Sequence, residues 1–407
     1  MEPLTRLRLS SRPDRALFVV ALGVMAAVSP MATDVYLASI PAVAGFFDAP
    51  ITAVQLSLST YMIGMAVGQF LLGPISDMLG RRRLIIAGSV VFVLASVGIA
   101  LSSSITVMLS LRAVQGAAGA AGVVIGRAMV SDTTTGTDAA KMYTLLGTIT
   151  SMAPIVAPLL GGVIATWAPW QTVFWLLAGF GLLMLAGAVL VLRETLPPRQ
   201  RSEAGVARIF VGAGQVMRDP VFMGWALALA FGFGALFSYI SASSFVLQNV
   251  VGLTEIGFSA AFAVCALGGV LGGLLNLRLL GTFSPGAILR TALLVMTVIN
   301  VAGLLALLLG APEWTILVHV VLAQACFGFV MGNAIALAQD RARERAGAGS
   351  AVLGLLQFLV AGLASPLTGI GGDDTALPMS EFMLVFSVLA LIAAVAAVRL
   401  SKRTAAG

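Results

Sequence analysis

The chain has 407 residues, of which 59% are hydrophobic and only 10% are charged. Its mean hydropathy of +1.04 excludes an ordinary soluble globule and indicates a membrane protein. The formal net charge of +6 does not indicate nucleic-acid binding, because the basic residues are scattered along the chain instead of forming one patch.

Twelve apolar stretches follow one another along the chain, each long enough for a spanning helix of roughly 20 residues. They are predicted at 16–40, 53–75, 84–103, 105–127, 142–166, 170–192, 221–247, 256–277, 288–310, 314–338, 348–371 and 380–400. The first stretch is about 25 residues long and others follow, so it is interpreted as a span and not as a cleaved signal peptide. We therefore expect an all-α membrane protein with little soluble structure.

The distribution of basic residues predicts the topology. If the N-terminus is cytoplasmic, every Lys and Arg except Arg112 falls on the cytoplasmic side, where such residues accumulate. Both termini are therefore predicted to be cytoplasmic. The longest polar interruption, 193–219, is predicted to be a cytoplasmic linker between two six-helix bundles, 1–192 and 220–407, which suggests a transport cavity between the bundles.

The first span carries one carboxylate, Asp34, within SPMATDVYLASIP. On a continuous helix it would share a face with Pro30, Met31, Ala38 and Pro41. Prolines remove backbone hydrogen bonds and loosen a helix, so this segment is predicted to bend beside a cavity.

The fourth span carries a cation, Arg112, in RAVQGAAGAAG, at about the same depth as Asp34, roughly 10 Å inside the membrane. A charge at the membrane centre costs about 2.5–3.5 kcal/mol, so such residues usually face a protein interior or a water-filled cavity. We prefer to interpret Asp34 as a proton acceptor, but a static Asp34–Arg112 ion pair stays open. Burial and a nearby guanidinium act on the pKa of Asp34 in opposite directions, so its direction is undecided.

Four further side chains are assigned to the same predicted cavity: Met31, Tyr36, Tyr61 and Gln115. The glycines that follow Gln115 are expected to allow close helix packing.

The fifth span contains SMAPIVAPLLGG, with Pro154, Pro158, Gly161 and Gly162. Two prolines and two glycines in one membrane helix predict a kink or a flexible joint. A static kink and a gating role both stay open.

The loop after the second span reads GPISDMLGRRR. Asp77 and Arg81 suit a charge clamp between neighbouring helix ends, and Asp77 could also cap a helix N-terminus. Arg82 and Arg83 are interpreted as topological anchors.

Polar residues are sparse in the second half of the chain, and they include Asn300, His319, Gln324, Asn333 and Gln357. We expect hydrogen bonds between helices from them, although their individual roles are undecided. Cys265 and Cys326 lack the spacing of a disulfide framework or a metal site. No metal and no cofactor are therefore expected.

These motifs together resemble the major facilitator superfamily. GPISDMLGRRR resembles its loop signature, LRAVQGAAGAA its fourth-helix arginine motif, and APLLGG its antiporter signature, although Ala157 stands where Gly is usual. With TDVYLASIP in the first span, the chain is similar to the Bcr/CflA group of bicyclomycin and chloramphenicol drug:proton antiporters.

The resemblance implies roles for particular residues. Asp34 would take part in proton or substrate coupling, with Arg112 in support. Gly73, Asp77, Gly80 and Arg81 would form the conformational switch loop, and Pro154, Pro158, Gly161 and Gly162 the antiport-type kink.

The predicted function is proton-coupled export of small amphipathic drugs or toxic metabolites across the cytoplasmic (inner) membrane, by alternating access. One alternative is a proton-coupled sugar or organic-acid transporter of the same fold. A membrane enzyme is a distant alternative, because a converging set of nucleophile, base or metal ligands is not recognisable. A channel or a scaffold is a further alternative. The predicted partners are a drug-like molecule, protons and the lipid bilayer, with no nucleic acid, and the chain is expected to be a monomer.

Overall fold

The computed structural model describes residues 12–201, 207–372 and 375–406, and every regular element in these ranges is helical. Twelve helices within them are long and apolar enough to cross a membrane, which confirms the predicted spans. The predicted cytoplasmic residues Arg6 and Arg8, and residues 202–206 of the predicted linker, lie outside the described ranges.

The helices follow the chain in two groups of six spans. The first six are α1 (Arg12–Asp34) with η1 (Leu37–Ser39) and α2 (Ile40–Phe47), α3 (Ile51–Leu79), α4 (Arg81–Ala100), α5 (Ile105–Thr133), α6 (Gly136–Trp167), and α7 (Gln171–Ala186) with η2 (Gly187–Val191). Between the groups lie η3 (Pro198–Gln200) and α8 (Ala207–Met217). The last six are α9 (Pro220–Phe245) with η4 (Val246–Val250), α10 (Glu255–Leu279), α11 (Pro285–Leu308), α12 (Trp314–Arg341), η5 (Arg343–Arg345) with α13 (Ala346–Leu367), and α14 (Leu377–Ala406).

Helix starts in the second group follow local sequence signals. The Asp219 carboxylate accepts hydrogen bonds from the backbone N–H groups of Val221 and Phe222 at the start of α9. Thr254 and Ser284 cap α10 and α11 in the same way. Each cap satisfies N–H groups that a helix start leaves without an intrahelical acceptor.

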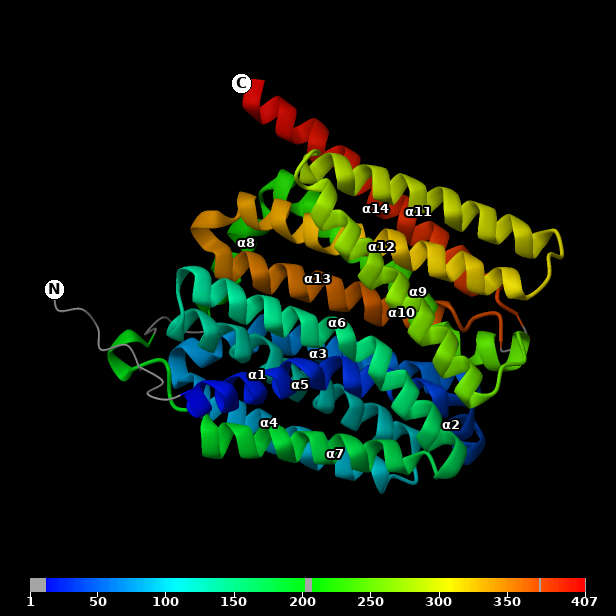
Figure 1. Cartoon of the computed structure of the whole chain (residues 1–407), viewed down its shortest axis with the longest axis horizontal. Coiled ribbons are helices and arrows are strands. Elements are labelled where there is room, and N and C mark those ends of the chain that lie inside the picture. The colour runs from blue at the N-terminus through cyan, green and yellow to red at the C-terminus, as the bar shows by residue number, and fades with distance from the viewer. Residues whose placement is uncertain (1–11, 202–206, 373–374, 407) are drawn as a thin grey trace.

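The two groups form two bundles that lie against each other (Figure 1). α1, α3, α4, α5, α6 and α7 pack among themselves, as do α9 to α14. Two pairs of helices join the bundles most extensively, α3 with α13 and α6 with α10. The predicted division of the chain at 192 and 219 stays a prediction.

Small residues allow α3 and α5 to pack backbone to backbone. A Cβ atom on Gly64 would overlap the Ala113 carbonyl oxygen, and one on Gly116 would overlap the Tyr61 carbonyl oxygen. Close packing of this kind is a main source of the free energy of helix association in lipid, because the hydrophobic effect contributes little there. The packing fixes the position of Arg112, one turn before Gly116.

Candidate functional site

Asp34 lies at a break in the first span. α1 ends at Asp34, a turn follows at Val35 and Tyr36, and the span resumes as η1 and α2. The predicted bend is therefore present, between Pro30 and Pro41. The predicted shared helical face is wrong for Ala38 and Pro41, because they lie on elements beyond the break.

The Asp34 side chain is buried, with 5% of the residue exposed. The neighbouring Thr33 hydroxyl donates to the carbonyl oxygens of Ser29 and Pro30, at 3.3 Å and 3.0 Å. These bonds occupy carbonyls of the turn before the break, in a helix that already contains Pro30. The carboxylate is thus placed at the end of a helix and is almost completely removed from solvent.

Arg112 is fully buried and binds main-chain oxygens of two other helices. Its Nη1 donates to the Ala32 carbonyl of α1 at 3.0 Å, and its Nε donates to the Ser57 carbonyl of α3 at 3.3 Å. Ala32 lies in the last turn of α1, where carbonyls lack intrahelical partners. The guanidinium therefore holds the broken end of α1 against α3 and α5.

Gln115 and two tyrosines also lie against this guanidinium, together with Phe174, whose ring is 5.7 Å from the guanidinium carbon. Gln115 Oε1 accepts from Arg112 Nη1 at 2.8 Å, and Gln115 Nε2 donates to the Ser96 hydroxyl at 2.7 Å. The rings of Tyr61 and Tyr36 lie 4.5 Å and 5.2 Å from the guanidinium carbon, within the range of cation–π attraction. The Ser57 hydroxyl donates to the Tyr36 hydroxyl at 3.2 Å. Three of the predicted cavity residues thus surround Arg112.

Asp34 and Arg112 do not form an ion pair. Within the described residues, no Lys or Arg nitrogen lies within 4.0 Å of an Asp34 carboxylate oxygen. The static ion pair that the sequence left open is therefore not the arrangement of this structure. Met31, the remaining predicted cavity residue, is buried one turn before Asp34.

The glycine pair of the fifth span lies between the break and the second bundle. A Cβ atom on Gly161 would overlap the Val35 carbonyl oxygen, directly after Asp34. A Cβ atom on Gly162 would overlap the Ser259 hydroxyl of α10. α6 runs as one helix through Pro154 and Pro158, and their role in a kink stays a prediction.

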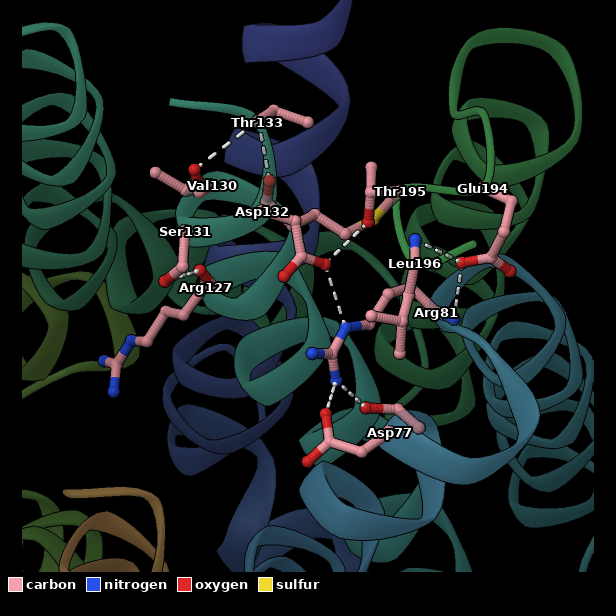
Figure 2. A network of polar contacts seen from close by, with 12 residues as sticks. Asp77, Arg81, Arg127, Val130, Ser131, Asp132, Thr133, Glu194, Thr195 and Leu196 are labelled. Carbon is pink, nitrogen blue, oxygen red and sulfur yellow. Dashed lines mark hydrogen bonds and ion pairs between the residues drawn. The ribbon is translucent and has the colours of Figure 1, made fainter. Parts of the chain in front are cut away.

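A second group of charged residues lies at the far ends of α3 and α5, as Figure 2 shows, with Arg81 between two carboxylates. Arg81 Nη1 pairs with Asp77 Oδ1 at 2.5 Å, and Arg81 Nε pairs with Asp132 Oδ2 at 3.1 Å. The Ser76 hydroxyl accepts from Arg81 Nη1 at 2.5 Å and donates to the Gly73 carbonyl at 2.6 Å. The structure thus brings the predicted pair Asp77 and Arg81 together, and adds Asp132 from α5.

Glu194 is a member of this group that was not identified from the sequence. Its carboxylate accepts from the backbone N–H groups of Arg81 at 2.9 Å and Arg82 at 3.3 Å, at the start of α4. Gly80 adopts φ +100°, and a Cβ atom there would lie 2.5 Å from Glu194 Oε2. The cap of α4 is therefore Glu194 and not Asp77, which lies inside α3 and faces Arg81.

Arg82, which was interpreted from the sequence as a topological anchor, also makes hydrogen bonds to another span. Its Nη2 donates to the Val189 carbonyl at 2.7 Å and its Nε to the Ala188 carbonyl at 3.2 Å, at the end of the sixth span. The Thr195 hydroxyl also donates to Asp132 at 2.8 Å. A sequence signal for these partners exists, since Asp132 and Glu194 are acids directly after apolar spans, but it does not reveal which basic residue they meet.

Polar side chains of the second bundle join helices, as predicted for three of them. Asn300 Nδ2 donates to the Met383 carbonyl at 3.1 Å, and Asn300 Oδ1 lies 3.0 Å from His319 Nε2. Asn333 Nδ2 donates to Asn276 Oδ1 at 2.8 Å. These bonds connect α11 with α12 and α14, and α12 with α10.

Comparisons with known proteins agree with this architecture. The family model described as Major Facilitator Superfamily matches residues 22–366. The chain is 34% identical over 382 residues to the "Uncharacterized MFS-type transporter YdgK" of Bacillus subtilis, covering 93% of this chain and 95% of the relative. It is 28% identical over 377 residues to the "Bicyclomycin resistance protein homolog" of Haemophilus influenzae, covering 92% and 95%. The solved D-xylose-proton symporter has a similar fold, with a TM-score of 0.72, 13% identity, and coverage of 94% and 96%.

Proposed function

Because this chain belongs to the major facilitator superfamily and is a multi-pass transporter of the inner membrane, we propose that it exports small amphipathic drugs in exchange for protons. Bicyclomycin- and chloramphenicol-type compounds are the proposed cargo. The observation that carries the proposal is Asp34, a buried carboxylate at a helix break that has no ion pair with Arg112.

The two charges have different proposed tasks. Arg112 is enclosed by aromatic rings and donates from Nε and Nη1 to main-chain oxygens, so its proposed task is to position the end of α1, although its Nη2 has no hydrogen-bond partner among the described residues. An anionic sugar acid or organic acid would need a cation in the cavity, and this arrangement does not favour it. A neutral or weakly cationic drug suits a site whose unpaired charge is a carboxylate, Asp34.

Exchange follows from competition at Asp34. Its carboxylate can hold a proton or a polar or cationic group of the cargo, but one oxygen site cannot hold both. A proton that enters from outside would displace the cargo outward, and loss of that proton to the cytoplasm would regenerate the carboxylate. Each proton that moves inward releases about 2.3 kcal/mol per 100 mV of membrane potential. Rocking of the two bundles would expose Asp34 to each side in turn.

The decisive variant is Asp34→Asn, assayed in proteoliposomes with an imposed pH gradient and chloramphenicol or bicyclomycin as the probe. We expect the rate of concentrative transport to fall by at least about tenfold in this variant, because an amide side chain does not bind and release a proton near neutral pH. The matched control is Glu313→Gln, an exposed acid before α12, which should transport like the wild type.

Two results would reject this function. One is an Asp34→Asn protein that still accumulates the drug against its gradient and still releases protons when the drug is added. The other is a wild-type protein that shows no proton exchange with either drug and instead accumulates D-xylose or an organic acid with protons, which would support the alternative cargo.

A further inference from the structure

Gln55 lies in α3 at the end of the molecule opposite Arg81, and it is fully buried at the seam between the two bundles. About 26 residues separate it from Arg81, so the two lie roughly 39 Å apart along the helix direction. Neither the sequence motifs nor the proposed exchange at Asp34 uses this residue.

Gln55 bonds to two helices of the other bundle. Its side-chain Nε2 donates to the main-chain carbonyl of Ser241 in α9 at 3.0 Å. The main-chain carbonyl of Gln55 accepts from the Ser365 hydroxyl of α13 at 3.1 Å. Ser241 and Thr368 hydroxyls lie 3.1 Å apart, and Thr368 donates to the Ser365 carbonyl at 2.8 Å. Gln55, Ser241, Ser365 and Thr368, which we name the Gln55 cluster, thus join one helix of the first bundle to two of the second.

The site is shaped for this glutamine. A Cβ atom on Gly369 would overlap Gln55 Oε1 and would lie 2.8 Å from a methyl carbon of Thr52. All four members of the Gln55 cluster are fully buried, so these polar bonds lie in a water-poor seam. A hydrogen bond is stronger in such surroundings than at the surface.

A depression in the surface lies directly outside the cluster. Asp48 and Thr52 line it from the first bundle, and Asn249, Gly369 and Ile370 line it from the second. Thr52 and Gly369 also lie against Gln55, so the Gln55 cluster closes the inner side of this depression. A second cross-bundle bond, from Gln248 Nε2 to the Ala38 carbonyl at 3.4 Å, adds to the contact on the segment after the Asp34 break.

One atom of the cluster has no partner. Gln55 Oε1 is a buried acceptor without a hydrogen-bond donor among the described residues. An unsatisfied buried acceptor disfavours the arrangement that buries it. The hydrogen bonds of the Gln55 cluster therefore stabilise the closed seam, whereas Gln55 Oε1 would gain a hydrogen-bond partner if the seam opened to water. These two opposing contributions keep the closure reversible.

We propose that Gln55 is the positioning residue of a gate, and that the Gln55 cluster seals the passage between the bundles at this end. The positive-inside topology assigns this end to the outer face of the membrane. Breaking the cluster would shift the protein from this closed arrangement to one that is open at the same end. The inference concerns the motion of the transporter and does not depend on the proposed drug or proton.

The experiment measures distances across both ends of the full-length protein in lipid nanodiscs, with spin labels and double electron–electron resonance. Labels at Asp48 and Ile370 report on the gated end, and both sites are exposed. Labels at Leu79 and Glu344 report on the opposite end. No cargo is added, so a wrong cargo assignment would not affect the result.

Gln55→Leu and Ser365→Ala are the test variants. For Ser365→Ala we expect the ratio of long to short Asp48–Ile370 distances to rise about fivefold, the effect of losing one typical hydrogen bond, while Leu79–Glu344 distances shorten. Gln55→Leu should shift the distances in the same direction but less, because it also removes the unsatisfied acceptor Oε1. The matched control is Ser387→Ala, a buried hydroxyl that donates to Leu384 in its own helix, and it should leave both distributions unchanged.

Gly369→Ala provides a separate test that keeps every hydrogen-bonding group. Because the added methyl group overlaps Gln55 Oε1, it should open the same end. If the folded Ser365→Ala and Gly369→Ala proteins both keep wild-type distances, the gate is rejected, even if Gln55→Leu does not fold. Equal shifts in the Ser387→Ala control would also reject it, since they would reflect general loosening.

Discussion

At the scale of single residues, Arg112 and Arg82 bind mainly backbone oxygens, whereas Arg81 pairs with the carboxylates of Asp77 and Asp132. Arg112 donates to the carbonyls of Ala32 and Ser57, and Arg82 donates to those of Ala188 and Val189. Charge-assisted bonds of this kind are stronger than neutral ones, and they need no second buried charge. This leaves Asp34 without a cation, which is the condition that the proposed exchange requires.

Glu194 is the residue whose removal we expect to weaken the charge cluster around Arg81. Glu194→Gln keeps an acceptor oxygen but removes a negative charge from the start of α4, where the helix dipole favours an anion by about 0.3–1 kcal/mol. The variant should have a lower melting temperature in detergent, and slower transport, than the wild type.

Glu313→Gln is the matched control for Glu194→Gln. Glu313 precedes α12, but its side chain does not cap that helix. Its variant should melt like the wild type. Equal melting temperatures for the two variants would contradict the capping role of Glu194.

At the scale of elements, the interrupted first span depends on a neighbour without a side chain. α6 approaches the Val35 carbonyl at Gly161, immediately after the residue where α1 ends. A helix end leaves carbonyls without intrahelical partners, so it is stable in a membrane only where protein covers it. The fifth span therefore supports the break at Asp34, in addition to any kink at its prolines.

Gly161→Ala tests this support. The added methyl group would overlap the Val35 carbonyl, so we expect a loss of stability of about 1–3 kcal/mol and reduced transport. Gly147→Ala, in the same helix, is the control, because its Cβ would meet no atom within 4 Å. Alanine exceeds glycine in helix propensity by about 1 kcal/mol, so the control should be as stable as the wild type or more stable. Similar losses in both variants would show that the Val35 contact is not responsible.

At the scale of the whole molecule, the two bundles are joined differently at their two ends. Hydrogen bonds of the Gln55 cluster cross between bundles, whereas Arg81 and the acids around it, Asp77, Asp132 and Glu194, connect α3, α4 and α5 with the segment after the sixth span. Among the residues that the structure describes, the hydrogen bonds of Gln55 cross from one bundle to the other, and those of Arg81 stay within the first bundle. Such asymmetry suits a protein that opens its ends alternately.

The orientation of these ends in the membrane is a separate prediction. Asp48→Cys should react with a membrane-impermeant maleimide on intact cells, and Gly281→Cys should react only after permeabilisation. Both sites are exposed, and the native cysteines are buried and should give little background. The reverse labelling pattern would invert the predicted topology.

Much of the fold was predictable, because a spanning helix is specified by its own stretch of apolar residues. The number of spans, the bend at Asp34 and the pairing of Asp77 with Arg81 all depend on residues close together in sequence. The extension of α5 to Thr133 was not predicted, since polar residues outside the apolar core continue the helix.

The sequence by itself determined the class of protein, the spans and the positions of the unusual charges, since each depends on local composition. Only the tertiary structure decided that Arg112 holds backbone oxygens and not Asp34, that Glu194 caps α4, and that Gln55 joins the bundles. Gln55 and Ser365 are 310 residues apart, and Arg81 and Glu194 are 113 apart. Helix packing determines which of these distant residues become partners. Small residues such as Gly64, Gly116 and Gly161 determine that packing, because they allow neighbouring backbones to approach closely, and this effect has no local sequence signal.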